Sequence, residues 1–519
     1  MNGHSLDRLS LEENRGLLNG PHSPGSDGDQ PGGILVLDRH STNSTWSRHL
    51  KSPVECLLNF RFRATAARIA WFCVPSFLQG RQMREQIRPA KLSPTAYLDG
   101  MRGLAALFVY FCHYGVLGYV VNHGYGWQGK MYDFWRLPFL RLWYSGPPAV
   151  SVFFVISGYA LSYKPIRLMR SRKTLDFSTT MSSMIFRRAI RLFLPTTIAT
   201  FMWVCLIRMG VYNLSKDLIK NRKYFRKGAG SVPPIPASAI EHFVAWGKHI
   251  FYSFTKVFDF MDRGALTKYD GHLWTIPVEY RCSLYLFLVL CGTARLQTKY
   301  RYLTVFAAMS VTYRQSRWDF LMFLCGMALA EWDHIRGAHV KSPALPLDEK
   351  VTQSSVHRLK PILWNLFSIV ALYLMSQPDG GGEETPGWVY LTSQIPEWWQ
   401  RPYRYWQSIG SVMFILAVGY SAFWRRVFNS GLIQYLGKIS YSLYIVHGPV
   451  GRMVGFHLQT LAWNITGVEG KWWDTGFVLG GVFSLAATIF FADIFWRAID
   501  VPTVQFARWF ESKVNIKED

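Results

Sequence analysis

Apolar residues gather in about ten runs along the chain, with polar sequence between them. A helix that spans a bilayer needs roughly 20 apolar residues. The run at 300–313 is short, which fits a tilted or partly buried helix, and the run at 238–258 is too polar to span freely and fits a re-entrant segment. The pattern predicts an all-α polytopic membrane protein of about ten transmembrane helices. We expect these spans near residues 99–120, 148–164, 188–209, 274–294, 300–313, 317–333, 361–376, 405–423, 437–457 and 475–497.

The sequence outside the runs divides the chain into four parts. Residues 1–53 are rich in Gly, Ser, Asn and charge, and predict a disordered cytosolic tail. Residues 54–94 mix aromatic side chains with arginines such as Arg61, Arg63 and Arg68, which fits an interfacial amphipathic segment better than a span. The transmembrane domain is expected at 95–505, and a cytosolic C-terminal tail at 506–519.

Composition supports the membrane assignment and narrows the possible partners. Half of the residues are hydrophobic and 16% are aromatic, and tryptophans such as Trp143 and Trp399 stand near the ends of runs, as at membrane interfaces. The formal net charge is +24, but the basic residues cluster beside apolar runs, so they predict contact with anionic membrane lipid and no nucleic-acid partner. The seven cysteines form no CxxC pair, and we expect reduced thiols, no metal site and no cofactor.

Loop charge predicts the orientation of the chain. Residues 164–191 carry eight Lys or Arg against one acid, whereas residues 377–400 carry four acids and no Lys or Arg. The positive loop is expected in the cytosol together with the N-terminus. Two glycosylation sequons, at Asn213 and Asn464, then face the outside and predict a glycoprotein, whereas Asn43 stays unmodified in the cytosolic tail. No cleavable signal opens the chain, which fits the endoplasmic reticulum or another endomembrane.

Ionisable residues inside a span are costly and are often functional. Asp99 is placed to cap the first helix, and Arg102 follows at its cytosolic end. His113 lies about 16 Å deeper along the same helix. A histidine in an apolar helix can serve packing alone, so a structural role for His113 stays open.

The fourth span carries a carboxylate at a similar depth. Glu279 lies one to two turns inside the outer surface, as His113 does on its own helix. A carboxylate beside an imidazole holds one tautomer and stabilises the protonated ring. A polar contact between helices without any chemistry explains the same two residues, and both interpretations remain open.

Two further groups of polar side chains lie on helix faces. Arg188 and Arg191 are three residues apart on one face at the cytosolic mouth of the third span, where they suit a phosphorylated ligand. Arg187 fits an ordinary membrane anchor. Near the end of the chain, Ser440, Tyr444 and His447 share a face; they line a pocket or satisfy one another, and the structural role is favoured.

Taken in order, these motifs resemble those of the transmembrane acyltransferase 3 family in its fungal-type form, over residues 95–505. Pro277 and Tyr280 depart from polar residues common in bacterial relatives, Gly448 stands where an aromatic is usual, and Asp500 stands where Glu is commoner. The resemblance rests on Leu98–Ala106, on the spacing of Arg102 and His113, on Phe153–Tyr159, on Arg188-x-x-Arg191, on His272–Glu279 and on Ile439–Pro449.

The resemblance implies an enzyme that moves an acyl group from acyl-CoA to a hydroxyl of a small-molecule acceptor such as a sugar, sterol, terpenoid or other metabolite. It implies His113 as general base with Glu279 orienting it. A transporter or flippase without covalent chemistry is the alternative, although no repeat of two halves is visible; a catalytically idle scaffold is a third possibility. Oligomeric state is not predicted. The expected binding residues are Arg102, Arg188 and Arg191 for acyl-CoA, and His272, Trp274, Tyr444 and His447 for the acceptor.

Overall fold

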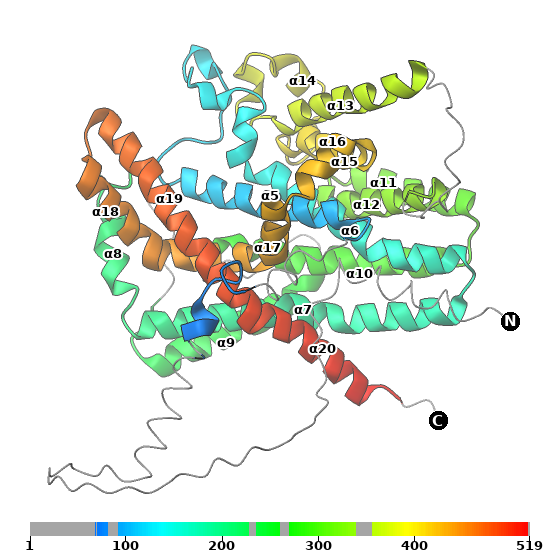
Figure 1. The fold of residues 1–519 in the computed structure, drawn as a ribbon, viewed down its shortest axis with the longest axis horizontal. Helices are drawn as coiled ribbons and strands as arrows, with labels where there is room; N and C mark the ends of the chain where they lie inside the picture. The colour runs from blue at the N-terminus through cyan, green and yellow to red at the C-terminus, as the bar shows by residue number, and fades with distance from the viewer. Residues whose placement is uncertain are drawn as a thin grey trace, which may run out of the picture.

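The computed structural model describes residues 68, 70–80, 92–227, 235–259, 269–338 and 355–516. Within these residues the regular structure is helical and contains no strand (Figure 1), which confirms the all-α prediction. The helices that match the ten predicted runs are α5 (Ala96–Gly115), α6 (Gly146–Arg170), α7 (Thr174–Arg208), α10 (Thr275–Thr293), α11 (Thr298–Arg314), α12 (Trp318–Ile335), α13 (Ser355–Met375), α15 (Arg404–Tyr420), α17 (Gly431–Val450) and α19 (Gly470–Phe495).

Shorter elements connect or extend these helices. The α-helical ones are α8 (Asn213–Lys220), α9 (Ala239–Thr255), α14 (Val389–Ser393), α16 (Ala422–Phe428), α18 (Phe456–Thr466) and α20 (Val501–Val514). The 3₁₀ turns are η1 (Trp127–Gly129), η2 (Phe134–Arg136), η3 (Leu140–Tyr144), η4 (Lys256–Phe258), η5 (Gly271–Trp274) and η6 (Gly382–Glu384). Two π-helical turns, η7 (Gly451–Gly455) and η8 (Trp496–Asp500), join α17 to α18 and α19 to α20.

Length and hydropathy identify the strongest membrane spans. Four helical stretches are long and apolar enough to cross a bilayer: Gly146–Arg170, Thr174–Arg208, Gly271–Thr293 and Gly470–Val514. A fifth is obtained if α15 and α16, which are bent by 99° at their junction, count as one broken span. The chain is therefore a membrane protein, while the number of about ten spans stays a prediction.

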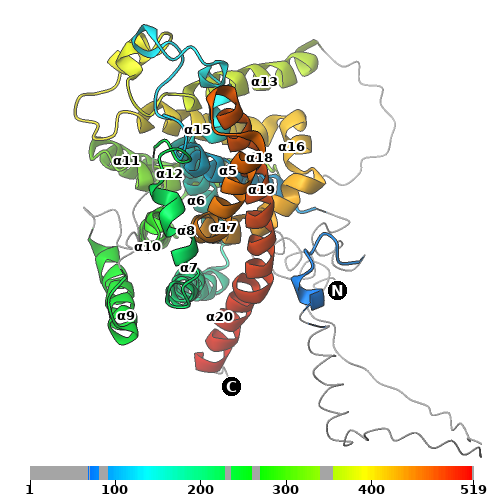
Figure 2. The ribbon, with the colours of Figure 1, turned by 90° about the vertical axis from the view of Figure 1, so that its left-hand side faces the viewer.

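The polar run at 238–258 forms α9, which begins at a capping box of Ser238 and Glu241. Trp246 of α9 donates a hydrogen bond of 3.1 Å to the Thr200 hydroxyl of α7. Figure 2 shows α9 at the edge of the molecule, beside α7. Its role as a re-entrant segment stays a prediction.

A hydrogen bond ties the N-terminal side of the domain to the bundle, and an ion pair ties the C-terminal side. The predicted interfacial segment is described at residues 68, 70–80 and 92–94, and the Ser76 N–H donates to Asp493 of α19 at 3.1 Å. Asp493 also pairs with Arg497 at 2.6 Å. α20 covers most of the predicted C-terminal tail, and its Glu511 lies 3.1 Å from Arg187 of α7. The predicted tail at 1–53, with Asn43, lies outside the described residues, as do Arg61 and Arg63.

Several helix pairs, among them α6 with α12 and α5 with α17, approach to backbone contact at glycines. A Cβ on Gly326 of α12 would lie 2.2 Å from the Val155 carbonyl oxygen of α6, and one on Gly158 would lie 2.2 Å from the Phe323 carbonyl oxygen. The pair α5 and α17 meets in the same way at Gly103. Small residues at such crossings allow the close van der Waals packing that holds membrane helices together.

The crossing of α6 and α12 gives a stability prediction. Gly326→Ala places a methyl group inside the neighbouring backbone, and we expect a loss of about 1–3 kcal/mol, seen as a lower thermal midpoint in detergent. Gly292→Ala in α10 is the matched control, because an added Cβ would meet no described atom within 4 Å. Equal midpoints for the two variants would contradict close packing at this crossing.

Candidate active site

Three imidazole rings from three elements meet inside the helix bundle. His113 comes from the last turn of α5, His272 from η5, and His447 from α17. The ring centroids lie 3.8 Å apart for His113 and His272, 4.4 Å for His272 and His447, and 5.4 Å for His113 and His447. The structure therefore joins the histidine predicted as general base to two histidines predicted on the acceptor side. We call these three residues the histidine cluster.

Hydrogen bonds assign the proton positions on His447. Its Nδ1 lies 2.7 Å from the Tyr444 carbonyl oxygen and 3.2 Å from that of Leu443. A carbonyl oxygen only accepts, so Nδ1 carries the proton and Nε2 keeps a lone pair. Nε2 is buried and has no hydrogen-bond partner among the described residues.

His272 is held from two sides. Its Nδ1 lies 2.7 Å from Oδ1 of Asp270, and its backbone N–H donates to the same oxygen at 3.1 Å, which caps η5. The Tyr444 hydroxyl bonds to the His272 carbonyl oxygen and lies 2.6 Å from the Thr275 hydroxyl. Tyr444 thereby fastens α17 to the turn that precedes α10.

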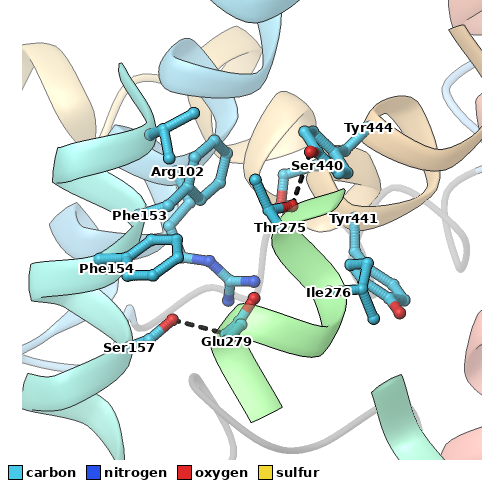
Figure 3. Close-up of a pocket in the computed structure, with 11 residues that line it drawn as sticks. Arg102, Phe153, Phe154, Ser157, Thr275, Ile276, Glu279, Ser440, Tyr441 and Tyr444 are labelled. Atoms are coloured by element: carbon cyan, nitrogen blue, oxygen red, sulfur yellow. Dashed lines mark hydrogen bonds between the residues drawn. The ribbon is translucent and has the colours of Figure 1, made fainter. Parts of the chain in front are cut away.

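A cavity lies between α5, α6, α10 and α17 (Figure 3), and none of the three cluster histidines is among its lining residues. Aromatic and aliphatic side chains form part of its wall, and Tyr444 belongs to both the cavity and the surroundings of His272. Figure 3 shows Arg102 and Glu279 pointing into the cavity toward one another. The polar lining comprises Arg102, Ser157, Thr275, Glu279, Ser440 and Tyr444.

Glu279 is held by an arginine and a serine. Its Oε1 accepts a hydrogen bond of 2.7 Å from Arg188 and one of 3.1 Å from Ser157, and Arg188 also donates to Ser283 at 3.0 Å. The expected hydrogen bond between Glu279 and His113 is not found among the described contacts. Glu279 instead turns toward α6 and α7, where the Arg188 guanidinium neutralises its charge.

The arginines predicted to bind acyl-CoA gather where the N-terminal half of α5 approaches the middle of α7. Arg191 lies close enough to Arg102, Arg188 and Asp500 to interact with them electrostatically. The Nε of Arg102 is buried without a hydrogen-bond partner in the described part of the chain. Three carboxylates, Asp99, Glu279 and Asp500, face these arginines and largely balance their charge, and the free N–H of Arg102 suits an anionic ligand.

Asp99 does not cap the first helix, contrary to the sequence prediction. α5 begins earlier, at Ala96 after Thr95, so Asp99 falls within the first turn. There its carboxylate lies 4.0 Å from Arg102. Trp274, predicted on the acceptor side, ends η5, and its ring centroid lies 5.9 Å from the Arg404 guanidinium carbon.

Sequence reasoning missed Asp270. The residue stands two positions before His272 in a loop, where aspartate is common as a helix cap, so nothing marked it for chemistry. The histidine cluster also has the chemistry to hold a metal ion, because its ring nitrogens lie within 4.8 Å of one another. The three residues that would serve as ligands are His113, His272 and His447.

Comparison with known proteins identifies the family. A family model described as an acyltransferase domain matches residues 95–497. The chain belongs to this acyltransferase 3 family. The match confirms the resemblance drawn from the motifs, and it spans the helices that carry the histidine cluster and the cavity. An acyltransferase acts on an acyl donor and an acceptor, so the chain has two substrates.

Three fungal acyltransferases resemble the chain over most of its length. O-acetyltransferase PaAT-1 of Phomopsis amygdali is 29% identical over 84% of this chain and 87% of its own. Acyltransferase R4 of a Phoma species is 24% identical over 79% of this chain and 93% of its own. Acyltransferase clz18 of Cochliobolus lunatus is 26% identical over 79% and 94%. No solved structure matches the chain. The relatives support a fungal-type member of the family.

Proposed function

We propose that this acyltransferase moves an acyl group from acyl-CoA to a hydroxyl of a small-molecule acceptor, with His113 as general base. The observation that carries the proposal is the histidine cluster together with a cavity lined in part by Arg102 and Glu279. Acetyl-CoA is the first donor to consider, because one relative carries the name O-acetyltransferase. Sugars, sterols and terpenoids are acceptor classes to test.

The cavity is proposed as part of a route between the two substrates. Arg102, Arg188 and Arg191 are proposed to bind the phosphates of acyl-CoA at the cytosolic end, since guanidinium groups match phosphate oxygens in shape and charge. The acyl-bearing arm then follows the cavity wall of Phe153 and Phe154 toward the histidine cluster. Arg188 also forms an ion pair with Glu279. It is therefore proposed both to bind the donor and to keep this carboxylate in place.

The reaction follows from proton transfer at the cluster. His113 takes the proton of the acceptor hydroxyl while the oxygen attacks the thioester carbonyl carbon. The bond between carbon and sulfur breaks, and the sulfur leaves with the proton returned by the imidazolium, which gives the ester and CoA-SH. A positioned base of this kind contributes about 10²- to 10⁴-fold in rate. On the acceptor side, His272, Trp274, Tyr444 and His447 are proposed to shape the pocket.

The cellular location of the enzyme is part of the same proposal. The chain is proposed to be a multi-pass protein of the endoplasmic reticulum or another endomembrane, with the N-terminus in the cytosol. The acyl donor then enters from the cytosol, and the sequons at Asn213 and Asn464, both exposed in the structure, face the lumen. A transporter or flippase is disfavoured, because the family model that covers the chain is an acyltransferase domain.

The base assignment predicts the behaviour of His113→Ala. Acyl transfer from acetyl-CoA or a longer acyl-CoA should fall by at least about 100-fold, because no imidazole takes the acceptor proton. Insertion in microsomes and the thermal midpoint in detergent should stay close to those of the unchanged protein. Turnover of this variant near the normal rate would rule out His113 as the general base.

The donor site predicts a selective effect on the Michaelis constants. Replacing both Arg188 and Arg191 with Gln should raise the acyl-CoA constant more than the acceptor constant, because cations that face the phosphates are lost. Arg187→Gln is the matched control, since Arg187 pairs with Glu511 of α20. Adding Glu279→Gln to the double variant relieves the unpaired carboxylate and separates that effect from donor binding. An unchanged donor constant would contradict the site.

The base role also predicts insensitivity to chelators. A ring nitrogen bound to a metal ion cannot accept a proton at the same time. Dialysis of the purified protein against EDTA should therefore leave the transfer rate unchanged. A loss of activity that added Zn²⁺ restores would instead make His113, His272 and His447 metal ligands.

A further inference from the structure

One carboxylate sits in the histidine cluster, and the proposed reaction has not yet used it. Asp270 is 2% exposed, and its Oδ1 lies 2.7 Å from His272 Nδ1. Its other oxygen, Oδ2, is buried and accepts no hydrogen bond from any described residue. A buried carboxylate with a free oxygen is costly to maintain, so its contact with the imidazole needs an explanation.

The surroundings of Asp270 leave its charge available to the imidazoles. The groups that face it are His272 of η5, His447 of α17 and Arg452 of η7, and the same arginine and both histidines also face His113. Glu279, the carboxylate expected beside His113, is neutralised by Arg188 at 2.7 Å. Asp270 is therefore the carboxylate that the described contacts place at the cluster.

Gly448 provides an independent observation. A Cβ at this position of α17 would lie 2.6 Å from Asp270 Oδ2 and 2.8 Å from His272 Nδ1. Both distances are shorter than side-chain atoms tolerate. The absence of a side chain at residue 448 thus lets the carboxylate and the imidazole rest together against α17.

We propose that Asp270 is a positioning residue for acyl transfer. Its carboxylate fixes His272 in the tautomer that carries the proton on Nδ1. The same carboxylate offsets the positive charge that forms when His113 takes the acceptor proton. The inference rests on the proposed function. Nδ1 of His272 lies beside Asp270, and Nδ1 of His447 faces a carbonyl oxygen, so a proton on each Nδ1 leaves the lone pair of each ring on Nε2. His113 then takes the acceptor proton close to the Nε2 atoms of His272 and His447 and to the negative charge of Asp270, and it returns the proton to the CoA sulfur.

The experiment compares four variants of the full chain in detergent with acetyl-CoA and an acceptor. Asp270→Asn keeps the shape but removes the charge, and kcat should fall about 10²- to 10⁴-fold while the acyl-CoA KM stays within about threefold. Asp270→Glu should retain more of kcat than Asp270→Asn. Gly448→Ala keeps every functional group but displaces the pair, and kcat should fall about 10- to 100-fold. Gly451→Ala is the control, because no described atom lies within 4 Å of its added Cβ, and it should behave as the unchanged protein.

The outcomes separate this inference from the proposed function. Loss of activity in His113→Ala together with near-normal kcat in Asp270→Asn would overturn the positioning role and leave the acyl-transfer proposal in place. An unchanged protein that transfers no acyl group from any acyl-CoA would instead defeat the proposed function. Should Asp270→Asn fail to fold, as shown by a lost thermal transition, Gly448→Ala decides, and kcat equal to that of Gly451→Ala would overturn the inference.

Discussion

A charged group inside a bilayer must find its partner on another part of the protein, and that requirement organises this molecule. Arg301 of α11 meets Glu331 of α12 at 2.7 Å, and Arg188 of α7 meets Glu279 of α10 at 2.7 Å. Removing one member of such a pair leaves the other charge buried, at a cost of roughly 3–5 kcal/mol. Each pair therefore fixes the rotation and depth of the helices it joins, which hydrophobic contact with lipid cannot do.

Backbone contact between α5 and α17 sets the geometry of the histidine cluster. A Cβ on Gly103 would lie 2.3 Å from the Gly437 nitrogen, so the two helices touch at these glycines. His113 and His447 each follow their glycine by ten residues, which is about 15 Å of helix on both sides. Because the two helices run in the same direction from the contact, the imidazoles arrive at a common depth. Small residues far from the cluster thus decide which rings meet.

The sequence was sufficient for the helices but only partly sufficient for the site. Apolar runs and interfacial charge predict where helices lie, and residue number predicts how far along a helix a side chain such as that of His113 or Glu279 is placed. Neither predicts which way a side chain turns around the helix axis. Glu279 turns to Arg188, and the cluster draws its carboxylate from Asp270. Asp270 lies in a loop before a short turn, where no periodicity marks a buried residue. The space for its carboxylate depends on Gly448, because a Cβ at that position would lie 2.6 Å from Asp270 Oδ2.

The charged groups around Glu279 and Asp270 explain why the two carboxylates are suited to different roles. Arg188 forms an ion pair with Glu279. Because the opposite charges lie close together, the pair has little net charge with which to stabilise a distant imidazolium. Asp270 has no arginine within ion-pairing distance among the described residues, and its contact is an imidazole whose charge depends on the proton. A fixed ion pair is suited to holding helices and a donor site in place. In the proposed reaction, a carboxylate against an imidazole is suited to a step in which positive charge appears and is then lost as the proton passes to the leaving sulfur.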